Sequence, residues 1–233
     1  MKRRTISDVA PQPSPNDAPV PLDVRKRAWG HFNTITQHKL LVTQLCFRAG
    51  LYAQGMLHDL SKYTPGEFAT GVRYFTGVRS PNATERDEKG FTEAWLHHKG
   101  RNKHHFEYWV DLVLVRTPEA VRPGFFDAGL SEPGTFPRLF YASAPMPTRY
   151  VVEMFCDRVA ACKVYQKERY TDASALEYYL KESCNRAIMH PDTQALLEVL
   201  LRMLAEEGEE TTLRFIREAI VQPRFSQGAY ARF

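Results

Sequence analysis

Apolar side chains recur with the period of an α-helix along most of this chain, and that periodicity restricts the fold more than any other feature. The clearest stripe lies between Asp23, a good N-cap, and Gly50, a residue suited to ending a helix. Its members, spaced by three, four or seven residues, are His31, Ile35, His38, Val42 and Leu45. Side chains with this spacing share one helical face. Both histidines are therefore predicted to lie on the buried face of this helix.

Further helices are predicted from the same period and from local start signals. One runs over 51–62, and the next begins at Thr64, where Pro65 and Glu67 complete a capping box with proline at the first helical position. Others are predicted around 91–100, over a long segment from Thr148, and over 172–181, 192–207 and 210–221. The chain is therefore predicted to be all-α.

Proline-rich stretches interrupt this pattern and divide the chain. Five of the 15 prolines fall between Pro11 and Pro21, which predicts a flexible tail over 1–22. Six prolines fall within 111–147, where we expect an irregular insertion or a small hairpin. The interpretation is a single helical domain over 23–221 that carries this insertion, with a C-terminal tail over 222–233.

Composition and charge exclude several classes of protein. Hydrophobic residues make up 43% and charged residues 25%, which is typical of a globular chain and not of a disordered or fibrous one. No apolar run approaches the roughly 18 to 20 residues that a membrane span needs. The net charge of +4 permits a phosphate-bearing partner but does not indicate nucleic acid. Four cysteines without a CxxC pair fit a reduced, cytoplasmic location, and a homo-oligomer stays open.

Histidines and acidic residues gather in a way that indicates a metal site. Six of the eight histidines lie between positions 38 and 105, and His58 is followed directly by Asp59. Adjacent helical residues point about 100° apart, so these two reach one ion only in a groove between helices. His38 and Asp157 lie on or beside buried stripes and are the natural further ligands. Lys62, four residues after His58, is placed to touch a bound phosphate or to pair with a ligand carboxylate.

This order of residues, with the run LHDLSK at 57–62, resembles the HD superfamily of metal-dependent phosphohydrolases. That superfamily carries a His, then an HD pair often followed by Lys, then a distant Asp, within a helical domain. A likeness over more of the chain, through HDLSK at 58–62 and AWLHHKGRNKHHFEYW at 94–109, is to an uncharacterised bacterial family with a domain of unknown function. The resemblance implies an HD-like helical bundle with His38, His58, Asp59 and Asp157 as metal ligands, and Asp59 and Lys62 as catalytic residues.

Two histidine doublets enclose a basic loop. HD hydrolases with binuclear sites use additional histidines between the HD pair and the final Asp, and His97, His98, His104 and His105 occupy that interval. Neighbouring histidines cannot all face one ion, so one of each doublet is expected to be a ligand and the other to support it or to bind substrate. Lys99, Arg101 and Lys103 lie between the doublets and are predicted to bind the substrate phosphate, with Arg101 as a bidentate clamp.

The resulting hypothesis is a phosphohydrolase that acts on a small phosphate ester or nucleotide through a metal-activated hydroxide. The cofactor is one or two divalent ions, Mn, Fe, Zn, Co, Ni or Mg. Two alternatives stay open at this point. Some HD-like helical folds hold two irons and oxidise their substrates, and a non-catalytic module that binds metal or an anionic partner has the same residue types.

Structural interpretations of the same residues also stay open. Asp59 could hydrogen-bond near a helix end beside a chance histidine, and Asp157 could pair with Arg158 or Lys163. The basic loop could be a solvated face of the protein. Glu153, four residues before Asp157, is interpreted as a residue that supports the ligands or lies at the surface.

Overall fold

The computed structural model describes residues 23–182 and 186–222. The flexible tail predicted at 1–22 lies outside the described residues. The C-terminal tail predicted at 222–233 also lies outside them, except for Gln222. The described chain is mostly helical, as predicted. Its α-helices are α1 (Val24–Arg48), α2 (Tyr52–Leu57), α3 (Pro65–Tyr74), α4 (Pro81–Lys89), α5 (Glu93–Lys99), α6 (Thr148–Gln166), α7 (Ser174–Lys181) and α9 (Pro191–Phe215). Short 3₁₀ segments are η2 (Leu60–Tyr63), η3 (Phe106–Trp109), η4 (Pro118–Ala120) and η5 (Lys167–Arg169), and a π-helical turn, η6 (Ile216–Val221), follows α9.

Helix α6 lies at the centre of the hydrophobic core. Its N-terminal two thirds are buried on most sides, with Val152, Cys156 and Val159 fully enclosed. It packs against α1, α7 and α9, and α9 contributes a row of buried leucines, Leu197, Leu200, Leu201 and Leu204. Burial of these apolar side chains stabilises the fold by about 25 cal/mol for each Å² removed from water. The three long helices therefore form a rigid frame on which polar residues of α1 and α6 are positioned.

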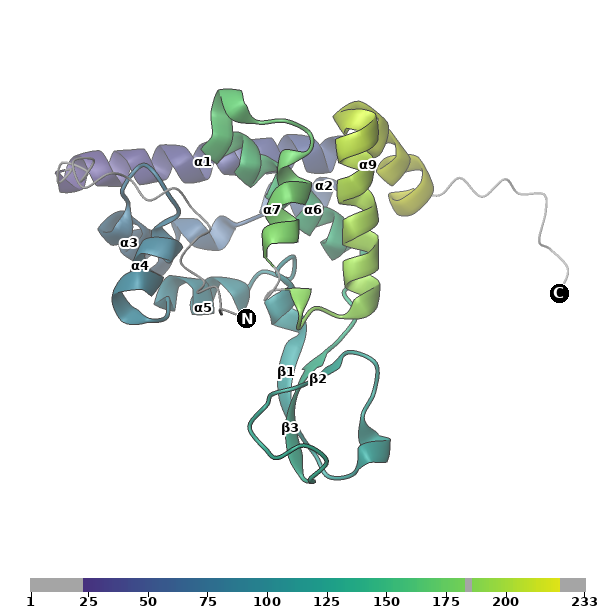
Figure 1. Ribbon diagram of the computed structural model, residues 1–233. Coiled ribbons are helices and arrows are strands. Elements are labelled where there is room, and N and C mark those ends of the chain that lie inside the picture. The colour runs from purple at the N-terminus through teal and green to yellow at the C-terminus, as the bar shows by residue number, and fades with distance from the viewer. Residues whose placement is uncertain (1–22, 183–185, 223–233) are drawn as a thin grey trace, which may run out of the picture.

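Helices α3, α4 and α5 form a second group beneath the N-terminal half of α1 (Figure 1), where α3 contacts α1, α4 and α5. The helix at Pro81–Lys89 forms in a polar stretch in which the apolar period gives no helical signal; Pro81 stands at its first turn and Gly90, with φ 81°, ends it. No helix within residues 23–182 and 186–222 has both the length and the apolar character that a membrane crossing requires.

A three-stranded antiparallel sheet corrects the all-α prediction. Its strands are β1 (Val110–Val115), β2 (Phe125–Asp127) and β3 (Arg138–Ser143), in the order β1-β3-β2. Val110 pairs with Ser143 and Phe125 with Ala142. The prolines of 111–147 exclude a helix, as expected, but the β-branched and aromatic residues between them pair in register. Figure 1 shows this sheet projecting from the helical body.

The predicted helix over 51–62 is also corrected. Helix α2 ends at Leu57, His58 is extended (φ −50°, ψ 128°), and Asp59 adopts the left-handed conformation (φ 53°, ψ 25°) before η2 begins. Aspartate is one of the few residues other than glycine that visits this region at modest cost. Because of this break, His58 and Lys62 do not lie on one face of a single helix, as their spacing of four residues predicted.

Candidate metal centre

Helices α1 and α6 supply the first pair of polar residues. His38 lies on the buried stripe of α1, and its Nε2 atom is 2.8 Å from Oδ1 of Asp157 on α6. The alternative pairing of Asp157 with Arg158 or Lys163 does not occur. Arg158 donates instead to Glu182 at 2.9 Å, and Lys163 pairs with Glu209. The carboxylate of Asp157 therefore faces the histidines.

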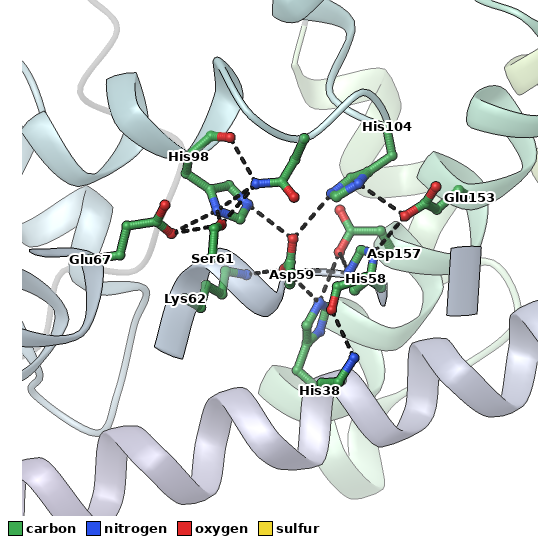
Figure 2. Close-up of polar contacts among 12 residues, drawn as sticks. His38, His58, Asp59, Ser61, Lys62, Glu67, His98, His104, Glu153 and Asp157 are labelled. Atoms are coloured by element: carbon green, nitrogen blue, oxygen red, sulfur yellow. Dashed lines mark hydrogen bonds and ion pairs between the residues drawn. The ribbon is translucent and has the colours of Figure 1, made fainter. Parts of the chain in front are cut away.

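The break between α2 and η2 places His58 and Asp59 beside this pair. Lys39 of α1 donates from Nζ to the carbonyl oxygens of Met56 (2.8 Å) and His58 (2.9 Å), which fixes the extended turn against α1. Both His58 and Asp59 are 1% exposed. The left-handed backbone conformation of Asp59 turns its own side chain towards the centre of the cluster of residues in Figure 2.

The two carboxylate oxygens of Asp59 face two different groups of residues (Figure 2). Oδ1 lies 3.1 Å from Nε2 of His98 and 3.3 Å from Nε2 of His104. Oδ2 lies 3.3 Å from Nε2 of His58 and 2.5 Å from Nζ of Lys62. Asp59 is therefore the residue at which segments from three parts of the chain meet.

The second doublet differs from the prediction that only one of its histidines faces the centre. His104 and His105 have ring centroids 4.1 Å apart, and the His105 ring also lies 4.9 Å from that of His98. Both residues belong to a group whose ligand atoms lie within 4.8 Å of one another. In the first doublet only His98 belongs to such a group; His97 is 37% exposed and pairs with Glu67 at the edge.

Two glutamates outside the centre orient the imidazoles. Glu153 Oε1 lies 3.0 Å from Nδ1 of His58 and 3.1 Å from Nδ1 of His104. Glu67 Oε2 lies 2.9 Å from Nδ1 of His98. A carboxylate on the outer nitrogen of an imidazole directs the other nitrogen inward, the arrangement usual for metal-ligating histidines. Of the two readings of Glu153, the structure shows the supporting one.

Glu67 is a residue of the site that the sequence interpretation missed. Helix α3 begins at Pro65 as predicted, but Thr64 donates its hydroxyl to the Ser61 carbonyl and makes no side-chain cap. Glu67 turns instead to Ser61 and His98. The spacing from Thr64 to Glu67 is the same whether the glutamate caps the helix or turns away, so the sequence contains no signal that separates the two.

The atoms that face the centre lack hydrogen-bond partners. Among the described residues, the buried Nε2 atoms of five histidines and both oxygens of Asp59 make no hydrogen bond of good geometry, although Asp59 pairs with Lys62 and His38 lies close to Asp157; the histidines are His38, His58, His98, His104 and His105. Leaving one buried polar atom unpaired costs about 1 to 3 kcal/mol, and native proteins seldom do so. A set of inward, unpaired nitrogen and carboxylate atoms fits a bound cation.

These atoms form overlapping groups with the spacing of metal ligands. One group comprises His38, His58, Asp59 and Asp157, and another comprises Asp59, His98, His104 and His105. A third, His58 with His104 and Glu153, joins the two through the outer glutamate. Because Asp59 belongs to the first two groups and turns one oxygen towards each, the residues present fit two ions that share one carboxylate.

The protonation of the centre reflects its crowded carboxylates. Burial lowers the pKa of His58, but nearby carboxylates, Asp59 foremost, reverse this and raise it well above its usual value. Burial likewise lowers the pKa of His104, but the neighbouring carboxylates of Asp59 and Glu153 outweigh it and raise the pKa to about 9. Burial raises the pKa of Asp59, yet His58 and Lys62 hold it well below its ordinary range. A divalent ion would displace these protons, since metal ligands bind in their deprotonated forms.

Arg101 and Lys103 of the predicted substrate-binding loop contact groups other than the carboxylates of this cluster. Arg101 is exposed and its guanidinium reaches only the His97 carbonyl, at 3.4 Å. The Lys103 ammonium lies over the rings of Tyr108 and Tyr150, 5.8 and 6.0 Å from their centroids. Within the described residues, neither these side chains nor Lys99 forms an ion pair with the carboxylates of the centre. Their predicted phosphate binding stays a prediction, whereas Lys62 lies directly at Asp59.

Comparison with known proteins places the chain in a family. A family of unknown function, DUF5662, matches residues 27–203, and the chain belongs to it. The match spans every residue of the centre, from His38 to Asp157. Neither the curated proteins nor the solved structures contain a match to this chain.

Proposed function

We propose that this protein is a metal-dependent phosphohydrolase with an HD-like centre that hydrolyses a small phosphate ester. The observation that carries the proposal is the position of Asp59 between two groups of imidazole and carboxylate ligands. These residues would hold one or two cations, and a pair of cations would suit in-line displacement at phosphorus, because one oxygen attacks as another leaves.

A divalent ion bound there supplies a water molecule of lowered pKa, about 7 in favourable sites, and polarises a phosphoryl oxygen. In the reaction, the water oxygen forms a bond to phosphorus and the bond from phosphorus to the ester oxygen breaks. One proton of the water ends on the released alcohol, and the other is lost to solvent or retained by the phosphate.

The protein's own residues position and neutralise the reacting groups. Glu153 and Glu67 keep the inner imidazole nitrogens directed at the centre. The Lys62 ammonium, 29% exposed, lies beside Asp59 on the side open to solvent. Asp59 raises the pKa of Lys62 against the opposing effect of burial, so this side chain stays cationic and is placed to contact a phosphoryl oxygen.

The donor set narrows the choice of metal. Five imidazole nitrogens and two carboxylates suit Mn²⁺, Fe²⁺, Co²⁺, Ni²⁺ or Zn²⁺, whereas Mg²⁺ prefers oxygen ligands and retained water. The nitrogen-rich set is also the observation that favours a second candidate, a di-iron oxygenase. The identity of the metal ion that the purified protein retains distinguishes the phosphohydrolase from the oxygenase.

The test combines metal analysis with a phosphatase assay. Protein purified under anaerobic conditions is analysed for bound metal, then assayed with Mn²⁺, Co²⁺, Ni²⁺ and Fe²⁺ on phosphomonoesters. His58→Ala is expected to lose bound metal and hydrolysis together. His190→Asn is the matched control, since His190 is 7% exposed, caps α9 by accepting from the Asp192 amide, and asparagine keeps a cap.

Each outcome separates the candidates. Metal-dependent hydrolysis that is lost in His58→Ala and kept in His190→Asn supports the phosphohydrolase. Stoichiometric iron with oxygen consumption and no hydrolysis favours the oxygenase. Equal inertness of the wild type and His58→Ala with every metal refutes catalysis and leaves a binding module.

A further inference from the structure

A cavity of about 80 Å³ adjoins the metal centre on the side of α3, α4 and α5. Three residues of its wall belong to the centre or its support: Lys62, Glu67 and His98. Figure 2 shows them together on the left of the cluster, and Figure 1 shows the helices that complete the cavity beneath the N-terminal half of α1. A molecule that reaches the centre past Lys62 therefore has this cavity beside it.

The rest of the polar lining consists of uncharged hydrogen-bonding groups. They come from α1, α6 and the start of α4, and they are Thr34, Ser80, Asn82, Tyr165 and His31. Such groups both donate and accept hydrogen bonds, as a hydroxyl group of a ligand also does. The lining thus has the chemistry that recognises neutral hydroxyl groups.

His31 is the buried member of this lining, 7% exposed. Its ring packs against Gly71, where an added Cβ would lie 2.2 Å from Nε2, so the ring has a fixed position. Its Nδ1 atom has no hydrogen-bond partner among the described residues. Burial, assisted by the Lys62 charge, lowers the pKa of His31 to about 4, which leaves it uncharged at neutral pH. His31 therefore contributes an uncharged ring to the lining.

The charges of the wall disfavour a phosphoryl group in the cavity itself. Lys62 is the one ammonium or guanidinium group among the described residues that line it, and it is already paired with Asp59 at 2.5 Å. Glu67 brings a carboxylate that faces His98 and His97. A dianion bound in the cavity would lie beside this carboxylate, whereas at the metal centre it would meet Lys62; an uncharged group in the cavity meets no such repulsion.

The size of the cavity sets a further limit. Its volume is well below the roughly 300 to 1,000 Å³ of pockets that enclose drug-sized ligands. A short chain of carbon atoms bearing hydroxyl groups fits such a space. A nucleoside is several times larger and does not.

We propose that this cavity is the subsite for the alcohol part of the substrate, and that the substrate class is the phosphomonoesters of small polyhydroxy alcohols rather than nucleotides. The inference rests on the proposed function for the position of the phosphoryl group at the metal centre. The hydroxyl groups of the alcohol then bind the neutral lining, with Asn82 and Tyr165 among their partners.

Binding of non-hydrolysable analogues tests the subsite separately from turnover. The probes are the phosphonate analogues of glycerol phosphate and of adenosine monophosphate, in which a methylene group replaces the ester oxygen. Binding to the metal-loaded protein is measured by calorimetry for the wild type, for Asn82→Leu and for Tyr165→Phe, which removes one hydroxyl. Asn33→Leu, a partly buried α1 residue outside the cavity, is the matched control.

The glycerol analogue is expected to bind the wild type at least about tenfold more tightly than the adenosine analogue. Asn82→Leu and Tyr165→Phe should each weaken its binding by about fivefold, the effect of one lost hydrogen bond, and leave the adenosine analogue unchanged. Equal or tighter binding of the adenosine analogue, binding of neither analogue, or no effect of either variant would overturn the subsite. Intact selectivity with no hydrolysis of any phosphomonoester would instead refute the proposed function and leave the subsite standing.

Discussion

Two clusters of charged residues in this protein have opposite states of pairing. In the surface cluster, where α1, α6 and α9 meet, Glu209 pairs with Arg48 and Lys163, and Glu210 pairs with Arg48 at 2.8 Å. In the centre, Lys62 pairs with Asp59 at 2.5 Å, His38 faces Asp157 at 2.8 Å, and Glu67 and Glu153 lie beside the other histidines. In the first cluster lysine and arginine side chains pair with the carboxylates, whereas in the second the groups facing the carboxylates are mostly histidines.

Burial makes this difference informative. Glu210 is 79% exposed, so water solvates whatever its partner leaves unsatisfied. Asp59 is 1% exposed, so water does not solvate its carboxylate. A buried excess of carboxylates costs several kcal/mol unless cations or protons neutralise it. The comparison teaches that the surface cluster is complete as a set of ion pairs, whereas the buried carboxylates depend on protonated histidines or on a cation that these residues could hold.

The largest expected effect comes from removing the shared carboxylate. Asp59→Asn keeps the left-handed backbone, because asparagine tolerates that conformation, but removes the charge that faces both ligand groups. We expect phosphatase activity to fall at least about 1,000-fold and bound metal to fall to one ion or none. Activity and metal content are measured on the same preparation. An Asp59→Asn protein with wild-type metal content would contradict the bridging role.

Lys62→Met tests the charge balance directly in the metal-free protein. Removing the ammonium 2.5 Å from Asp59 leaves the buried carboxylates less neutralised and is expected to lower the free energy of unfolding by about 2 kcal/mol. Saturating Mn²⁺ or Zn²⁺ should restore most of this loss, since the ion supplies the missing charge. Urea unfolding with and without metal measures both effects.

Arg48→Met is the control from the surface cluster. Its ion pairs are partly solvated, so we expect a loss of about 1 kcal/mol or less that added metal does not restore. If added metal restored the free energy of unfolding of Lys62→Met and Arg48→Met equally, the proposed difference between the two clusters would be wrong.

Glu153→Gln tests whether the outer carboxylate of the centre supports metal binding by its histidines. The variant keeps the shape of the side chain but weakens its hold on the Nδ1 atoms of His58 and His104. Loss of such an outer carboxylate typically weakens metal binding 10- to 100-fold, and we expect a decrease of about that size by calorimetry. Glu177→Gln, at an exposed position on α7, should leave the affinity unchanged.

The smallest effect is expected from Glu209→Gln and depends on pH. Burial raises the pKa of Glu209, but Lys163 and Arg48 outweigh it and hold the pKa below its usual value of 4.5. A carboxylate whose pKa is lower in the folded protein stabilises it above pH 4.5, and the contribution is lost as the pH falls through the folded value. The variant should therefore be about 1 kcal/mol less stable than wild type at pH 7 and equal to it near pH 3. An unfolding difference that does not shrink in acid would contradict this ion pairing.

Local periodicity explains which parts of the centre the sequence predicted. His38 follows the apolar stripe of α1, and Asp157 with Glu153 follows a stripe of α6, so the helical period alone turned them inward. It failed at His58 and Asp59, because one left-handed residue replaces a helical turn and no spacing reveals it. At 111–147 it predicted an irregular insertion or a small hairpin, and the structure has a three-stranded antiparallel sheet, whose pairing between distant strands the helical period does not report.

The sequence by itself determined the kinds of ligand available and the helical faces that carry His38 and Asp157. The tertiary structure decided which histidines converge: His98 rather than His97, and both His104 and His105. It also decided that Glu67 supports an imidazole instead of capping α3. The physical reason is that a helical period reports only the direction of a side chain about its own axis. Convergence on one point depends on how separate helices pack and where the chain breaks between them.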